Sequence, residues 1–266
     1  MARASVRLLR PMAQLGVGFF HGIGARVLFA RDTVRAFSEV STWRVHVIPQ
    51  MRVIGVDSLP LAALVAAFIG GVIALQVRYQ LFPGVSLSAV GLAARQMVIL
   101  ELGPLLTGLV LAGRVGARMT AEIGTMRVTE QIDALETLAY DPVAYLVVPR
   151  LIAGTLMLPL LVVFANAVGI GSGMLTALVA TDVTYAEFAE GLRLGFTEFQ
   201  LIYSLIKATM FGFAIAFLCT FEGYATTAGS AGVGSATARA VVFTSVAILL
   251  LDAVTALLLA PYLQAS

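Results

Sequence analysis

Five apolar runs dominate the chain, and each is long enough to cross a membrane as a helix. They cover residues 59–77, 93–112, 151–180, 199–221 and 240–263. About 20 helical residues cross the hydrocarbon core of a bilayer. The third run, which begins near Tyr145, is longer than this, so we expect it to tilt, to kink at Pro159 or to protrude. The pattern predicts five membrane-spanning helices.

The segment before the first run has an amphipathic pattern. Apolar residues recur near helical spacing at Leu15, Phe19, Ile23, Val27, Val34 and Phe37, and arginines accompany them at Arg26, Arg31 and Arg35. A helix of this kind lies in the membrane interface, with its arginines at anionic headgroups. We therefore predict a cytoplasmic or interfacial region at 1–52 and a five-span membrane domain at 53–266.

Three polar or small-residue segments separate the runs. Residues 121–142 are rich in charge, and residues 181–198 contain Thr184 and Glu187 at the spacing of a capping box, which predicts a short surface helix. Residues 223–234 are rich in glycine and are expected to form a loop. Because no lysine follows these glycines and no strand precedes them, the loop does not resemble a phosphate cradle.

Composition supports an all-α integral membrane protein. Hydrophobic residues make up 59% of the chain and charged residues 12%, whereas soluble domains have about 45–50% and about 25%. The net charge of +2 gives no indication of a nucleic-acid partner. Cys219 is the single cysteine, which excludes an internal disulfide and a CxxC metal site. The two histidines, His21 and His46, are too few for a histidine-based metal site. We expect no cofactor and no catalytic site on this chain.

The basic residues predict the orientation. With the N-terminus in the cytoplasm, 13 of the 17 lysines and arginines fall in segments on the cytoplasmic side. Cytoplasmic segments of membrane proteins carry such an excess. The expected topology has a cytoplasmic N-terminus, an outer C-terminus and the charged segment 121–142 in the cytoplasm.

That charged segment is predicted to form one helix over about 121–139. Neither glycine nor proline occurs from Thr125 to Ala139, and Asp141-Pro142 ends the helix, since a residue before proline avoids helical backbone angles. The helix could simply join two spans in solvent. Alternatively, its apolar face could enter a groove on a cytoplasmic partner while its acids meet a basic rim. The residue pattern leaves both interpretations open.

Four ionisable residues lie in or near the spans. A charge at the bilayer centre costs about 2.5–3.5 kcal/mol, so such residues face protein or a wet cavity. We interpret Arg150, near the inner end of its span, as structural, and leave Asp252 open between function and pairing with an arginine. Glu101 and Lys207 come early in spans that enter from the outside, so we expect them to meet across an outward cavity.

Small residues recur at four-residue steps in two spans. These are Gly108, Ala112 and Gly116 in the second and Gly169 and Gly173 in the third. Such spacing allows close approach of helix backbones. Packing inside one bundle and a seam between two copies are both compatible with it.

Several motifs resemble one transporter family. The segment ELGPLLTGLVLAGRVGARMTAEIGTMRVTEQIDALETLAYDP (101–142) is similar to the signature of the MlaE/YrbE permeases, the membrane subunits of ABC transporters that work with MCE-domain proteins. Further similar segments are FIGGVIALQ (68–76), PRLIAGTLMLPLL (149–161), LIKATMFGF (205–213) and GYATTAGSAGVGSATARAVV (223–242). The resemblance covers nearly the whole chain.

The resemblance implies a non-catalytic permease subunit that moves phospholipid or a similar hydrophobic molecule between the inner membrane and the outer envelope. A separate cytoplasmic ABC ATPase would hold ATP and magnesium and receive the 121–139 coupling helix. The other implied partners are an MCE-domain protein on the outer side, a second copy of the chain, membrane lipid and a small accessory cytoplasmic protein on the ATPase. The coupling residues would be Glu122, Arg127, Glu130, Asp133, Leu135 and Glu136.

The substrate path implied by the resemblance lies at the centre of the dimer. Glu101 and Lys207 would border it, together with Leu75, Gln76 and Tyr79 at the outer end of the first span. Many relatives read Arg-Glu-Leu-Gly-Pro where this chain has Leu100 before Glu101, so a cation for a headgroup is missing here. The alternative reading is a self-sufficient secondary transporter or channel that uses Glu101, Lys207 and Asp252 as a relay.

Overall fold

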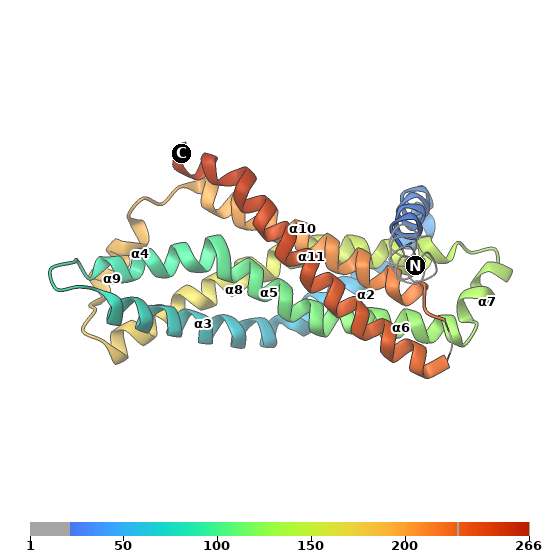
Figure 1. The fold of residues 1–266 in the computed structure, drawn as a ribbon, viewed down its shortest axis with the longest axis horizontal. Coiled ribbons are helices and arrows are strands. Elements are labelled where there is room, and N and C mark those ends of the chain that lie inside the picture. The colour runs from blue at the N-terminus through green and yellow to red at the C-terminus, as the bar shows by residue number, and fades with distance from the viewer. Residues whose placement is uncertain (1–21, 228, 266) are drawn as a thin grey trace, which may run out of the picture.

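A computed structural model of the chain describes residues 22–227 and 229–265, and the regular structure in this part is helical throughout. Within it, five helical runs are long and apolar enough to cross a membrane: Val40–Gln80, Ser88–Val128, Val143–Ala180, Glu198–Tyr224 and Gly229–Leu259. They pack side by side in one elongated bundle (Figure 1). The predicted all-α membrane protein with five spans is confirmed.

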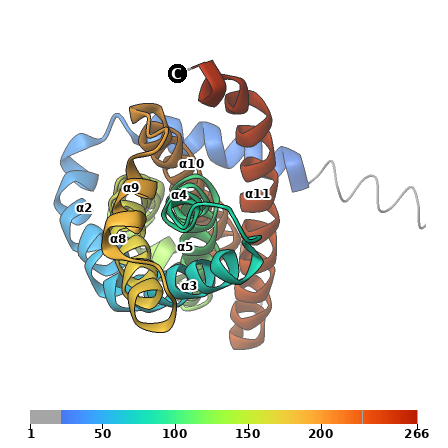
Figure 2. The same ribbon diagram turned by 90° about the vertical axis from the view of Figure 1, so that its left-hand side faces the viewer.

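A helix at residues 22–36 lies across the bundle rather than along it (Figure 2). The first part of the predicted amphipathic segment, with Leu15 and Phe19, lies outside the described residues. Phe29 is buried against α10 (Glu198–Tyr224), with its ring centroid 5.4 Å from that of Phe221. Val27 and Val34 are exposed on the other side, as suits a helix whose apolar face enters the membrane interface.

The first membrane run starts earlier than the predicted span at 59–77. Helix α2 (Val40–Ile54) continues through the 3₁₀ turn η1 (Val56–Ser58) into α3 (Leu59–Gln80). Residues 40–52 were grouped with the interfacial region, yet α2 packs along α8 (Val148–Ala180). This moderately polar stretch contacts the rest of the protein: Ile54 is buried, and the centroid of the His46 ring lies 4.3 Å from that of the Tyr145 ring.

The second run is interrupted by two π turns. Its elements in order are α4 (Ser88–Gln96), η2 (Met97–Leu102), α5 (Gly103–Leu111), η3 (Ala112–Gly116) and α6 (Ala117–Val128). The π turns η2 and η3 each insert extra backbone into a turn, and such turns frequently occur at functional sites.

The expectation of one helix over 121–139 is wrong. Helix α6 ends at Val128, and α7 (Gln131–Thr137) begins after Glu130, whose φ of 59° is left-handed. The Thr129 hydroxyl donates to the Thr125 carbonyl at 2.8 Å and so satisfies one carbonyl at the end of α6. The break turns Ile132 into the protein, where it is fully buried beside Val147.

The third run consists of the π turn η4 (Val143–Val147) and α8, which continues through Pro159 as one helix. Helix α9 (Tyr185–Arg193) then lies on the surface, and its predicted capping box is present: Thr184 and Glu187 bond each other's backbone N–H groups.

The glycine-rich segment 223–234 is mostly helix rather than the expected loop. Helix α11 (Gly229–Ala265) begins within it, and Gly229 itself has a φ of 58°. Glycine weakens an isolated helix, but packing against other helices outweighs this cost. Here the start of α11 packs on α6: a Cβ atom added at Gly124 of α6 would lie 3.5 Å from Cγ1 of Val233 in α11.

The small residues pack inside the bundle. A methyl group at Gly70 of α3 would overlap the carbonyl oxygen of Gly169 in α8, and one at Gly212 of α10 would overlap that of Gly154. In the second run, Gly108 faces Phe211 and Gly116 faces Cys219. Of the two interpretations left open above, internal packing applies to these glycines.

The two ends of the bundle differ (Figure 1). At one end, here called the α4–α9 end, the buried Arg95 donates to the carbonyls of Leu192 and Leu194 at 2.8 and 2.9 Å. This cation at the C-terminus of α9 complements the helix dipole and fastens α9 to α4. At the other end, the α7 end, the short α7 projects beyond the long helices.

Candidate functional site

A buried ionic cluster joins three helical runs, and Lys207 lies at its centre. The Lys207 side chain is 0% exposed, and its Nζ lies 2.7 Å from Glu101 Oε2 and 2.8 Å from Asp252 Oδ1. Glu101 comes from η2, Lys207 from α10 and Asp252 from α11. The expectation that Glu101 and Lys207 meet agrees with this geometry. We call these three residues the Lys207 cluster.

Pro104 explains why Lys207 also reaches backbone. Because proline has no N–H, the carbonyl four residues earlier, that of Leu100, lacks its usual helical donor. Lys207 Nζ donates to this oxygen at 3.3 Å, within the π turn η2. The ammonium also lies 4.8 Å from the centroid of the Tyr203 ring, a cation–π contact.

The Lys207 cluster has more acidic than basic groups, and its two acids differ in solvent exposure. Two carboxylates face one ammonium, so a fully ionised cluster carries one net negative charge. Glu101 is 45% exposed, whereas Asp252 is 11% exposed. A cationic or hydrogen-bond-donating group that approaches the cluster would therefore meet Glu101 first.

The sequence left the role of Asp252 open, and the structure shows its partner. The structural alternative paired Asp252 with an arginine, but Asp252 forms an ion pair with Lys207. Arg150 instead lies 3.2 Å from Glu122 and donates to the Leu146 carbonyl at 2.8 Å. Arg150 is thus paired near the α7 end, as its structural interpretation expected.

Leu75, Gln76 and Tyr79 lie apart from the Lys207 cluster. Leu75 lines a groove between α3 and α8 that also contains Thr176, and Gln76 and Tyr79 are exposed. The structure therefore brings together two of the five residues predicted for the substrate path, Glu101 and Lys207, and places the other three on the surface of α3.

Sequence reasoning missed a buried polar pair next to the cluster. Asn166 Nδ2 donates to Ser204 Oγ at 3.2 Å, and the buried Asn166 Oδ1 lies against Gly103 without a hydrogen-bond partner. Ser204 lies on α10 three residues before Lys207. The signal was a single asparagine inside a long apolar run, which marks a buried polar contact by the same reasoning that singled out Asp252.

The predicted coupling residues gather at the α7 end. Glu122 forms ion pairs with Arg118 at 2.7 Å and with Arg150 at 3.2 Å. Arg127 spans the break between α6 and α7, because it forms an ion pair with Asp133 at 2.7 Å. Glu136 is exposed, and Leu135 is half-buried against the group of apolar side chains that includes Ile132 and Val147. The charged surface is thus carried by a packed α6–α7 unit.

A second ionic contact holds the crosswise helix in place. Arg26 Nη2 lies 2.7 Å from Glu222 Oε1, and Arg239 Nε lies 3.5 Å from Glu222 Oε2. The guanidinium of Arg26 also lies 4.9 Å from the Phe221 ring centroid. Glu222 therefore links the helix at 22–36 to α10 and α11.

These features define a multi-pass helical membrane protein with a buried ionic cluster and a charged helical unit at one end. Comparison with known proteins specifies the class further. Residues 47–258 match the family described as Permease MlaE. This chain belongs to the MlaE permease family, and is thus an ABC transporter permease.

Relatives come from distant organisms. A probable ABC transporter permease protein of Rickettsia prowazekii is 38% identical over 238 residues, which cover 88% of this chain and 90% of the relative. The intermembrane phospholipid transport system permease protein MlaE of Haemophilus influenzae is 31% identical, over 93% of this chain and 95% of its own. The TRIGALACTOSYLDIACYLGLYCEROL 1 protein of Arabidopsis thaliana chloroplasts is 31% identical, over 88% of this chain and 66% of the relative.

Proposed function

We propose that this permease moves phospholipid, or a similar hydrophobic molecule, between the inner membrane and the outer envelope. The name of the Haemophilus influenzae relative, which specifies intermembrane phospholipid transport, supports this substrate class. Two copies of the chain would enclose the lipid path, and an MCE-domain protein would continue it on the outer side. The chain itself is non-catalytic.

Energy would come from a separate cytoplasmic ABC ATPase that binds ATP and magnesium. The α7 end would face the cytoplasm, which the excess of basic residues on that side supports. The N-terminus would then be cytoplasmic and the C-terminus periplasmic. A small accessory protein would bind the ATPase rather than this chain.

The observation that carries the coupling proposal is how α7 is seated. Its outer face presents acids such as Glu136, whereas Ile132 on its inner face is fully buried beside Val147 and Phe221. Val147 belongs to the third run and Phe221 to α10. A partner that pushes on α7 would therefore act on α6, against which α7 packs, and through the shared apolar core on the third run and on α10.

The Lys207 cluster would line the substrate path. Glu101 is the exposed member and would meet the headgroup, while Lys207 and Asp252 hold it in position. Because Leu100 replaces the arginine common in relatives, this path offers a carboxylate rather than a cation at its border. The chemistry favours headgroups that donate hydrogen bonds or carry an amine.

A charge reversal at α7 tests the function. The chain would be co-expressed with the proposed partner ATPase and reconstituted, and ATP-dependent transfer of labelled phospholipid would be measured. We expect Glu136→Lys to reduce binding of the ATPase and transfer at least tenfold, because an acidic contact to a basic rim becomes repulsive. Glu190→Lys is the matched control, an exposed acid at the opposite end on α9.

Two results would contradict the proposal. Normal ATPase binding and normal transfer by Glu136→Lys would show that α7 is not the docking helix. Transfer by the isolated chain without ATPase and ATP would instead favour the secondary transporter.

A further inference from the structure

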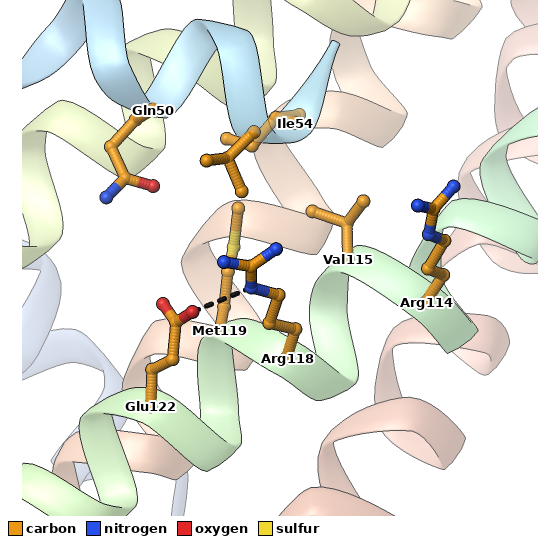
Figure 3. Close-up of a pocket in the computed structure, with 8 residues that line it drawn as sticks. Gln50, Ile54, Arg114, Val115, Arg118, Met119 and Glu122 are labelled. Carbon is orange, nitrogen blue, oxygen red and sulfur yellow. Dashed lines mark hydrogen bonds and ion pairs between the residues drawn. The ribbon is translucent and has the colours of Figure 1, made fainter. Parts of the chain in front are cut away.

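We propose that Arg114 and Arg118 bind the phosphate of an anionic phospholipid in a cavity between α2 and the η3–α6 junction. The cavity is drawn in Figure 3, where α2 residues Gln50 and Ile54 face Val115, Arg118 and Met119 across it. This place lies at the α7 end and is distinct from the Lys207 cluster. Binding there requires neither ATP-driven transport nor a second copy of the chain.

The size of the cavity limits what enters it. Its volume is about 20 Å³, and a single water-sized sphere takes roughly 10–15 Å³ on the same measure. One or two phosphate oxygens therefore fit inside, and the rest of a lipid has to lie outside the mouth. A site of this size recognises a headgroup oxygen and does not enclose a transported molecule.

Among the described residues, Glu122 is the only acid that lines the cavity, and it is already neutralised. Arg118 Nε donates to Glu122 Oε1 at 2.7 Å, and Arg150 Nη2 donates to Glu122 Oε2 at 3.2 Å. Both carboxylate oxygens are thus engaged by guanidinium groups. In the part of the chain that the structure describes, the terminal nitrogens of Arg118 have no partner and remain free to donate.

Arg114 adds a cation without a partner. Its guanidinium makes no hydrogen bond or ion pair within the described residues, and it lies at the edge of the cavity beyond Val115 (Figure 3). Arg114, Arg118 and Arg150 with Glu122 carry a formal charge of +2. Arg114 is exposed and the Arg118 side chain is 56% exposed, so an anion outside the cavity can reach both guanidinium groups. Guanidinium groups match phosphate oxygens in a bidentate geometry.

The position of the two arginines favours a lipid over free phosphate. The second apolar run ends at residue 112, so Arg114 and Arg118 follow it at the level where headgroups are expected. Basic pockets between membrane helices on the cytoplasmic side are known sites for acidic headgroups.

Lipid binding to the purified full chain tests this site. Native mass spectrometry would compare retention of phosphatidylglycerol with that of phosphatidylcholine. We expect wild type to prefer phosphatidylglycerol, Arg114→Gln to weaken this lipid about fivefold, and Arg114→Gln with Arg118→Gln to weaken it about thirtyfold. Arg44→Gln is the matched control: Arg44 is exposed on α2, outside the cavity, so its loss removes the same charge without effect.

Folding does not confound this test. Arg114 holds no other residue in place, so Arg114→Gln should melt at the wild-type temperature, even if the double variant folds poorly. Wild-type affinity of Arg114→Gln for phosphatidylglycerol would overturn the proposal, as would an equal loss in Arg44→Gln. A second arm adds millimolar inorganic phosphate. Full displacement of the lipid by phosphate would show a free-anion site and contradict a lipid ligand.

Discussion

At the scale of single residues, the structural role of Lys207 has to be separated from the function proposed for its cluster. Lys207 has no solvent exposure and touches two carboxylates, so its removal leaves Glu101 and Asp252 facing each other without a cation. A transport defect in an alanine variant of Lys207 would therefore not distinguish a lost substrate contact from a damaged fold. Glu101 is the better probe, because Glu101→Gln leaves the ion pair between Lys207 and Asp252 in place.

We expect Lys207→Met to lower the free energy of unfolding by about 3–5 kcal/mol, the usual effect of removing one partner of a buried ion pair. Glu101→Gln should cost less than about 1 kcal/mol, since Glu101 is partly exposed. Denaturant titration in mixed micelles measures both. Equal losses in the two variants would contradict the central position of Lys207.

The residues of this cluster could be found from the sequence, but of their pairings only that of Glu101 with Lys207 could be predicted. A charge in an apolar run must find a partner, which singled out Glu101, Arg150, Lys207 and Asp252. The choice among partners depends on distances between helices far apart in sequence. Glu101 and Lys207 were matched because both lie near the outer end of their spans, and Asp252 had no comparable indication.

At the scale of elements, the break between α6 and α7 is the main departure from prediction. Helical periodicity and the absence of glycine and proline favoured one helix over 121–139. The left-handed Glu130 carries no local signal, because glutamate is a good helix former. The burial of Ile132 and the bond between Arg127 and Asp133 decide the local geometry. By contrast, the capping box before α9 was predictable because both partners lie within four residues.

The left-handed position gives an element-scale prediction. Glu130→Gly should raise the free energy of unfolding by about 0.5–1 kcal/mol, because glycine adopts a positive φ without steric cost. Glu136→Gly, inside α7, should lower it by about 1 kcal/mol, the usual penalty for glycine in a helix. Thermal melts in detergent would compare them. A loss of stability in Glu130→Gly would contradict a left-handed residue at the junction.

At the scale of the whole molecule, the apolar runs predicted the number of spans, and the basic residues predict the orientation. The lengths of the helical runs were underestimated, because the predicted spans were limited to the most apolar stretches. In the structure, each of the five described runs begins before its apolar stretch, and the first, second and fourth also extend past its end; polar side chains such as Glu122 and Arg150 pair there. Pairing between neighbouring helices allows charged residues to continue a membrane helix.

Orientation can be tested with single cysteines in a Cys219→Ala background, with the chain expressed alone. Thr137→Cys on α7 and Tyr185→Cys on α9 lie at opposite ends and are exposed. Because the α7 end carries most basic residues, we expect a membrane-impermeant maleimide to label Tyr185→Cys in intact spheroplasts. Thr137→Cys should react only after lysis, and the reverse pattern would refute a cytoplasmic α7.

The glycine contacts described above also divide the bundle mechanically. Where Gly70 meets Gly169 and Gly212 meets Gly154, main chains touch with no side chain between them, so α3, α8 and α10 have no room to slide or to accept a larger residue. Helix α11 rests on its neighbours through side chains such as Ile248 and Leu251 and is the least buried of the long runs. Any change of shape during a working cycle is therefore easiest as a swing of α11 against a stiff three-helix frame.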